Sequence, residues 1–180
     1  MQNTHGYAKP RTQTFDLILT AMLTALVFVS TVFLNIRLPI VANGGLVHLG
    51  TAMLFIASIL FGPKKGAIAG AVGMGLFDLV GGWTLWAPIT IVARGLQGYI
   101  VGKIAMSNGR NGKNVTVNVL ATVVSVPVML AVYYVGEAII FASWIAPAAS
   151  IVGNLVQNTV GIIIALIVSI PLKKLPIFNR

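Results

Sequence analysis

The chain has 180 residues, of which 57% are hydrophobic and 8% are charged. Because a soluble domain carries about 25% charged residues, this composition excludes an ordinary water-soluble domain and favours a protein solvated by lipid. The sequence lacks cysteine, which excludes disulfides and thiolate metal sites, and its net charge of +9 has to be read together with the membrane topology.

Six apolar segments, each a candidate transmembrane helix, follow one another along the chain. They cover residues 16–34, 46–61, 67–80, 87–106, 115–141 and 147–172. The Gly-Pro-Lys-Lys-Gly run at 62–66 separates the short second and third segments, and a re-entrant hairpin is the alternative to two full spans there. The pattern predicts an all-α integral membrane protein with a single domain over residues 1–180, built as a bundle of six transmembrane helices.

Nearly all lysines and arginines fall on one side of the membrane if the six spans alternate in direction. They are Lys9, Arg11, Lys64, Lys65, Lys103, Arg110, Lys113, Lys173, Lys174 and Arg180. Arg37 lies on the opposite side, and Arg94 is inside the fourth span. The positive-inside rule therefore places both termini, the tail 1–15 and the loop 107–114 in the cytoplasm. The charge indicates orientation in a membrane that the chain crosses several times, and it does not indicate a nucleic-acid partner.

Polar side chains within the spans gather in their outer halves, which predicts one pocket open to the outside. The candidate binding residues are Arg94, Gln97, Glu137, Asn154 and Asn158. Asp78 lies near the outer end of the third span. Other roles remain open: an ion pair of Arg94 with Asp78 or Glu137, capping of the outer interface by Glu137, or hydrogen bonds between helices.

Aromatic residues and a long loop lie at the predicted outer surface. Trp83, Trp86 and Tyr133 are candidates to stack on a flat ligand, and the alternative is an aromatic belt at the headgroup level. The loop 35–47 contains Asn43 followed by two glycines and is predicted to act as a lid. His48, which follows this loop, is a further candidate site residue, and exposure at the membrane interface is the alternative.

Small residues recur at intervals of four in the first and third spans, which allows close approach of another helix. In the third span this stripe favours packing inside the bundle. In the first span, Ala21 and Ala25 lie toward the predicted cytoplasmic end and form a candidate docking face for another protein.

Several short motifs, taken in order, resemble a known family. They are Ala-x-x-x-Ala at 21–25, Gly-Pro-Lys-Lys-Gly-Ala-Ile-Ala-Gly-Ala at 62–71, Asp-Leu-Val-Gly-Gly-Trp at 78–83, Trp-Ala-Pro at 86–88 and Arg-Gly-Leu-Gln-Gly at 94–98. Together they resemble the S components of energy-coupling factor (ECF) vitamin transporters. The resemblance is greatest to the branch for hydroxymethylpyrimidine and pyridoxine, with the riboflavin branch a near relative.

The resemblance implies a substrate-binding subunit that captures a vitamin or precursor at the outer face. It implies a transmembrane T component and two cytoplasmic ATPases as partners, with the alanine motif contacting the T component and the loop 35–47 closing over the ligand. The residues themselves fit a small heteroaromatic ring, because Glu137 can accept from a ring amine or hydroxyl and amides both donate and accept.

Other functional classes remain as alternatives. One is an autonomous channel or secondary carrier, although the sequence has no obvious inverted repeat. Another is an intramembrane enzyme, which the missing catalytic and phosphate-binding motifs oppose. The sequence predicts no catalytic residue, no metal site and no cofactor.

Overall fold

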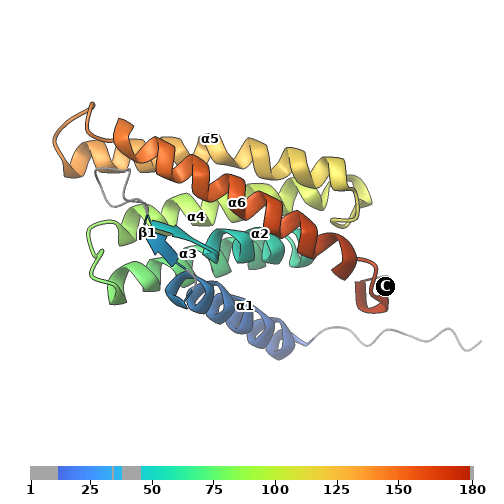
Figure 1. The fold of residues 1–180 in the computed structure, drawn as a ribbon. Helices are drawn as coiled ribbons and strands as arrows, with labels where there is room; N and C mark the ends of the chain where they lie inside the picture. The colour runs from blue at the N-terminus through green and yellow to red at the C-terminus, as the bar shows by residue number, and fades with distance from the viewer. Residues whose placement is uncertain (1–11, 34, 38–45, 179–180) are drawn as a thin grey trace, which may run out of the picture.

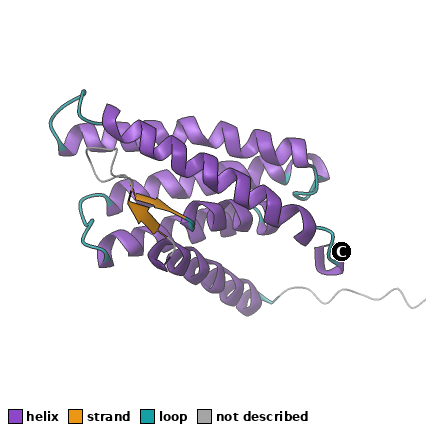
Figure 2. Ribbon diagram, viewed as in Figure 1, coloured by secondary structure: helices purple, strands orange, loops and turns teal. Residues whose placement is uncertain are grey.

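A computed structural model describes residues 12–33, 35–37 and 46–178. Its elements in chain order are α1 (Gln13–Phe33), β1 (Asn35–Arg37), β2 (Leu46–His48), α2 (Gly50–Phe61), α3 (Pro63–Val80), α4 (Ala87–Ala105), η1 (Ser107–Gly109), α5 (Val115–Ile140), α6 (Ala148–Leu172) and η2 (Pro176–Phe178). The described residues therefore form a six-helix bundle with one short hairpin (Figures 1 and 2). The all-helical prediction is confirmed apart from this hairpin.

The connections between the helices define two ends of the bundle (Figure 1). The hairpin end holds β1 and β2, the α3–α4 connection and the α5–α6 connection. The terminal end holds the start of α1, the α2–α3 turn, the α4–α5 loop and the end of α6. The two described termini lie at the same end, as an even number of alternating helices predicts.

The loop predicted as a lid begins and ends in the antiparallel hairpin. Residue 35 pairs with residue 48, and residue 37 pairs with residue 46. Ile36 and Val47, opposite each other in this pairing, are β-branched residues that favour extended structure. The loop tip, including Asn43, lies outside the described residues, and its role as a lid stays a prediction.

The helix α2 is the most enclosed part of the bundle. Ten of its 12 residues are buried, and it contacts α1, α3, α4 and α6. At a rise of 1.5 Å per residue it measures about 18 Å, which is shorter than the hydrocarbon core of a bilayer. The helix begins at Gly50, four residues later than predicted, because residues 46–48 pair with β1 instead of extending it.

The predicted break between the second and third segments is confirmed at Gly62. This residue has φ of 88°, a backbone conformation that glycine adopts without strain. Pro63 then opens α3 at a position where its missing N–H costs no hydrogen bond. The helix begins four residues earlier than predicted, so that Lys65 lies in its first turn and pairs with Asp16 of α1 at 2.9 Å.

Close contacts between glycines set the distance between α3 and α4. A Cβ atom on Gly98 would lie 2.5 Å from the carbonyl oxygen of Gly66, and one on Gly102 would lie 2.4 Å from the backbone nitrogen of Pro63. Gly70 lies against Leu54 and the backbone of Arg94 in the same way. The small residues of the third segment thus pack inside the bundle, as predicted.

The boundaries of the segments predicted to be cytoplasmic differ slightly from the structure. Residues 13–15, assigned from the sequence to the N-terminal tail, belong to α1, and residues 1–11 lie outside the described part. The loop 107–114 contains η1 and ends at Asn114, whose side chain accepts a hydrogen bond from the Val117 N–H at 3.0 Å. This bond caps α5 at its start.

Three of the described helices, α1, α5 and α6, are long and apolar enough to cross a membrane by length and composition. α3 and α4 have 18 and 19 residues and include charged side chains such as Asp78 and Arg94. Large apolar side chains, including Leu17, Val123 and Ile163, are exposed on the outer surface. The structure supports a membrane-embedded six-helix bundle and bears out only part of the prediction of six full spans.

Candidate functional site

Two facing helices, α4 and α5, carry the polar and aromatic residues nearest the hairpin end. Trp86, Thr90 and Arg94 occupy successive turns of one face, and Tyr133 and Glu137 lie one turn apart on the other. Trp86 Nε1 donates to Glu137 Oε1 at 3.2 Å, and the hydroxyls of Thr90 and Tyr133 share a hydrogen bond of 2.8 Å. The Arg94 guanidinium carbon lies 5.3 Å from the centroid of the Tyr133 ring, within range of a cation–π interaction.

A chain of amide hydrogen bonds continues from Arg94 across to α6. Arg94 Nη1 donates to Gln97 Oε1 at 2.9 Å, and Gln97 Nε2 donates to Asn158 Oδ1 at 2.7 Å. Asn158 Nδ2 donates to the backbone carbonyl of Asn154 at 2.7 Å. Arg94 is 2% exposed and Asn158 is 1% exposed, so these bonds lie in the interior.

Seven residues, linked by hydrogen bonds and ring contacts from the hairpin end into the bundle, are called the polar ladder below. They are Trp86, Thr90, Arg94, Gln97, Tyr133, Glu137 and Asn158. At 1.5 Å per residue the ladder reaches about 15 Å below the first residue of α4. It joins α4 to both α5 and α6.

α3 contributes a carboxylate beside the polar ladder. Asp78 is 9% exposed and interacts with Thr90 and, electrostatically, with Arg94. Among the described residues, Asp78 Oδ2 and Glu137 Oε2 are buried without a hydrogen-bond partner. Leaving a buried polar atom unsatisfied costs about 1–3 kcal/mol, so such atoms are sites for a ligand or an ordered water.

A second polar group connects the hairpin to α2 and α6. Gln157 Nε2 donates to Thr51 Oγ1 at 2.7 Å and lies 3.0 Å from His48 Nε2. The His48 ring also lies 6.0 Å from the ring of Phe77, measured between centroids. His48 is therefore positioned by α6 and α3, and it also interacts electrostatically with Arg94 of the polar ladder.

Aromatic rings gather at the hairpin end. Trp86 packs edge-to-face against Trp83, with ring centroids 5.6 Å apart, and against Phe141 at 6.0 Å. This geometry is favoured by the quadrupoles of the rings. The cluster places Trp86 between the α3–α4 connection and the end of α5.

The structure brings most of the predicted site residues together. Arg94, Gln97, Glu137, Asn158, Trp86 and Tyr133 are members of the polar ladder, and Trp83 adjoins it through Trp86. Asn154 contributes through its backbone carbonyl. That these residues bind a ligand stays a prediction.

The alternatives for these residues are resolved in part. Asn158 does bond to a neighbouring helix, as one alternative predicted. Glu137 accepts from Trp86 through one oxygen, and Arg94 contacts Gln97 and Tyr133. These contacts hold the helices together and leave the second carboxylate oxygen of Glu137 available.

Thr90 and Thr51 were not predicted as site residues. Thr90 lies four residues after Trp86 and four before Arg94, so helical spacing alone places it on the same face. The role of Thr51 has no such signal, because it depends on how α2 and α6 are rotated within the bundle.

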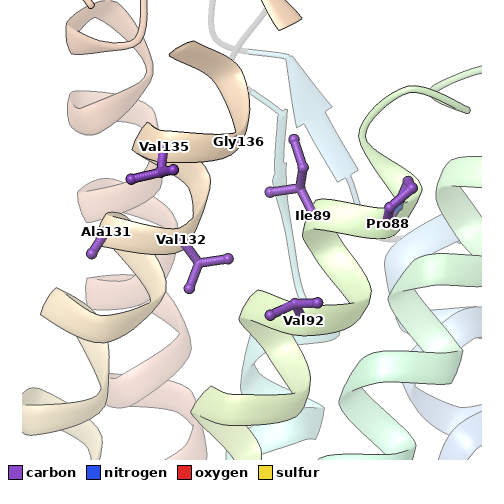
Figure 3. A pocket seen from close by; sticks show the side chains of 7 residues that line it. All are labelled: Pro88, Ile89, Val92, Ala131, Val132, Val135 and Gly136. Carbon is purple, nitrogen blue, oxygen red and sulfur yellow. The ribbon is translucent and has the colours of Figure 1, made fainter. Parts of the chain in front are cut away.

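An apolar groove lies between α4 and α5 (Figure 3). It has a volume of about 530 Å³ and is lined by Pro88, Ile89, Val92, Ala131, Val132, Val135 and Gly136. Val92 is two residues from both Thr90 and Arg94, which corresponds to about 200° around a helix. The groove therefore opens on a different face of α4, and its apolar lining suits the hydrocarbon of the membrane.

The predicted docking face on α1 is accessible. Ala21 and Ala25 are exposed, whereas Leu23, Val27 and Thr31 are buried toward α2 and α3. A face of small side chains between exposed apolar ones permits close approach of another membrane helix. Docking at this face stays a prediction.

A comparison with family models agrees with this architecture. The model of the ECF-type riboflavin transporter, S component, matches residues 11–174. The chain belongs to this family. This S component is therefore a subunit of a transporter and not an enzyme, as the sequence predicted.

The S component also has similar proteins of known sequence or structure. An uncharacterised protein of Pyrococcus woesei is 33% identical over 129 residues, which are 72% of this chain and 83% of that protein. The thiamine precursor transporter HmpT of Lactococcus lactis subsp. cremoris is 27% identical over 163 residues, or 91% of this chain and 90% of HmpT.

A solved structure described as the S component of a bacterial ECF transporter shares the fold. The two superpose with a TM-score of 0.68 at 20% sequence identity, over 94% of this chain and 100% of that one. This likeness supports the arrangement of the six helices.

Proposed function

We propose that this S component captures a small heteroaromatic vitamin or vitamin precursor at the hairpin end and delivers it inward as part of an ECF transporter. The observation that supports this proposal is the polar ladder, a set of buried polar side chains within an apolar bundle. Polar groups at membrane depth are costly and usually mark binding sites or transport paths. Trp86 and Tyr133 offer ring faces beside the donors and acceptors, a combination typical of small-molecule sites.

The proposed orientation places the terminal end in the cytoplasm and the hairpin end outside. Lys64, Lys65, Lys103, Lys113 and Lys173 all belong to elements or loops at the terminal end. An excess of lysine on one side supports a cytoplasmic location under the positive-inside rule. The protein would then cross the cell membrane several times, with both termini inside.

The proposed substrate is a hydroxymethylpyrimidine-like or pyridoxine-like ring, and riboflavin is the alternative. The family is named for riboflavin, whereas the relative HmpT is named for a thiamine precursor. Mass spectrometry of the small molecule that co-purifies with the protein, followed by titration of that compound in detergent, tests this proposal. Purified protein that binds no heteroaromatic vitamin or precursor would contradict it.

The proposed partners are a transmembrane T component and two cytoplasmic ATPases. Ala21→Trp and Ala25→Trp are expected to prevent assembly with the T component, because bulky side chains block close helix approach. Ligand binding by the free subunit should remain. Leu26→Trp is the control, since Leu26 is also exposed on α1 but lies about 140° from Ala21 around the helix. Normal assembly of the Ala21→Trp, Ala25→Trp double variant would refute this docking face.

Concentrative uptake is expected to require those partners. The experiment compares proteoliposomes that contain the S component alone with proteoliposomes that contain the complete complex and ATP. Uptake against a gradient by the S component alone would favour the secondary-carrier alternative.

A further inference from the structure

We propose that Asp78 and Glu137 form an acceptor pair that recognises the ligand, and that the ligand is an amino-substituted heteroaromatic ring. This inference rests on the proposed function and narrows its substrate class. It assigns a binding role to Asp78, on α3, in addition to the residues of α4, α5 and α6.

The distribution of acidic residues is the first observation. The whole chain contains three acidic residues. Asp16 lies at the terminal end and pairs with Lys65. The other two, Asp78 and Glu137, are 9% and 5% exposed and both border the polar ladder. Placing two of three acids in the interior of an apolar bundle is costly, so a specific role for them is expected.

The hydrogen bonds of the two carboxylates are the second observation. Glu137 has one side-chain donor that orients it, Trp86, and Asp78 interacts with Thr90 and Arg94. The second oxygen of each, Asp78 Oδ2 and Glu137 Oε2, is buried without a hydrogen-bond partner among the described residues. A carboxylate oxygen can only accept, so the missing partners are donors.

The two carboxylates are arranged around one face of α4. Trp86 and Thr90, which interact with Glu137 and Asp78 respectively, are one helical turn apart. Arg94, one turn further on, interacts electrostatically with Asp78 and lies over the Tyr133 ring. A ring bound beside these residues would meet aromatic faces from α4 and α5 and acceptors from α3 and α5.

The formal charges favour a ligand that brings donors. Two carboxylates and the Arg94 guanidinium sum to −1 when all three are ionised. An exocyclic amine supplies two N–H donors, and a basic ring nitrogen can add a positive charge next to a carboxylate. A ring edge made of carbonyl oxygens would instead place acceptors against acceptors, which is unfavourable in a buried site.

The test measures binding to the purified protein in detergent by titration calorimetry. The probes are 4-amino-5-hydroxymethyl-2-methylpyrimidine, its analogue with an oxo group in place of the amine, and riboflavin. The parent is expected to prefer the amino compound over the oxo analogue on the order of ten- to a hundredfold, the effect of one charge-assisted hydrogen bond. Asp78→Asn and Glu137→Gln are each expected to lose most of that preference, and Asp16→Asn is the control that should keep it.

Folding of each variant is checked by its melting temperature and by gel filtration. Thr90→Val provides a second test of Asp78, because it keeps the carboxylate but removes the hydroxyl that interacts with it. This variant should lower the preference for the amino compound while the affinity for the oxo analogue changes little.

Two results would overturn the inference. One is a parent protein that binds riboflavin or the oxo analogue more tightly than the amino compound, which would leave the S-component function standing. The other is an unchanged preference in folded Asp78→Asn, Glu137→Gln and Thr90→Val. Failure of the parent to bind any of the probes or any other heteroaromatic vitamin would refute the proposed function along with this inference.

Discussion

Asn158 holds two helices together with a single amide group. Its oxygen accepts from Gln97 of α4, and its nitrogen donates to the carbonyl of Asn154 within α6, both at 2.7 Å. A hydrogen bond between membrane helices contributes about 0.6 kcal/mol on average, and at most about 1.7 kcal/mol. Leaving the partners unpaired costs about 1–3 kcal/mol, so the larger effect of losing Asn158 comes from the groups it leaves behind.

Replacing Asn158 with leucine is therefore expected to lower the free energy of unfolding by about 1–3 kcal/mol. Thermal unfolding in detergent without ligand measures this effect. The double variant Asn158→Leu, Gln97→Leu should lose less stability than the sum of the losses in the two single variants, because both substitutions remove the same hydrogen bond. Thr159→Val, at the exposed neighbouring position, is the control and should change stability by less than about 0.5 kcal/mol. Additive effects would contradict the interaction.

Lys173 follows α6 and is buried at the terminal end. Its Nζ atom donates to the Leu60 carbonyl at 3.1 Å and lies 4.9 Å from the centroid of the Phe178 ring. Burial, and after it the positive charge of Lys113, lowers the pKa of Lys173 from 10.5 to about 8. The unfolded chain therefore retains this proton to a higher pH than the folded chain does.

The linkage relation gives the sign of the resulting pH dependence. Stability rises with pH wherever the unfolded state binds more protons. For Lys173 that window lies between about pH 8 and 10.5, and the melting temperature of the parent is expected to rise across it. Lys173→Met should flatten the rise, whereas Lys174→Met, at the exposed neighbour, should keep it. A Lys173→Met profile as steep as that of the parent would refute the assignment.

At the scale of the elements, two glycines of α4, Gly95 and Gly98, contribute differently to the contact between α3 and α4. A Cβ atom on Gly98 would clash with backbone atoms of Gly66, whereas a Cβ atom on Gly95 would meet the Ala71 side chain at 3.4 Å, an ordinary contact. Backbone cannot move aside as a flexible side chain can. The two positions therefore form a matched pair on one helix.

Gly98→Ala is expected to destabilise the protein by about 1–3 kcal/mol, because it forces the two helices apart. Gly95→Ala should be neutral or stabilising by up to about 1 kcal/mol, since alanine favours the helix. Melting temperatures of both variants in detergent test this contrast. Equal effects of the two substitutions would show that the helix contact does not limit stability.

The helix boundaries that the sequence predicts best are those of α4, α5 and α6. Each agrees within one residue at either end with the segments 87–106, 115–141 and 147–172, because polar loops with glycine or proline bound their apolar runs. α2 is predicted poorly, because an apolar run does not distinguish a short buried helix from a full span. The hairpin before it depends on pairing between residues 35–37 and 46–48, which hydropathy does not report.

The candidate site likewise has features that the sequence predicts and features that it does not. Spacing of four residues predicts that Trp86 and Arg94 share a face, and that Tyr133 and Glu137 share another. Spacing cannot predict that Gln157 turns toward Thr51 and His48 while Asn158 turns toward Gln97. Those choices follow from the rotation of α6 within the packed bundle.

At the scale of the whole molecule, the proposed orientation can be tested because the parent lacks cysteine. Thr84→Cys lies in the connection between α3 and α4 at the hairpin end, and Leu175→Cys lies beyond α6 at the terminal end, both at exposed positions. A membrane-impermeant maleimide is expected to label Thr84→Cys in intact cells and Leu175→Cys only after permeabilisation. The reverse pattern would invert the topology and move the polar ladder to the cytoplasmic side.

Because α2 is enclosed by other helices, its contacts form in a fixed order as the chain is synthesised. A nascent chain emerges from its N-terminus, so α2 enters the membrane before α3, α4 and α6, which surround it in the finished bundle. With a length of about 18 Å it is shorter than the hydrocarbon core of a typical bilayer. α2 therefore gains its complete surroundings only after α6 has been synthesised as far as Leu172. Chains that stop at the end of α5 would leave one side of α2 exposed and available to the quality-control proteases of the membrane.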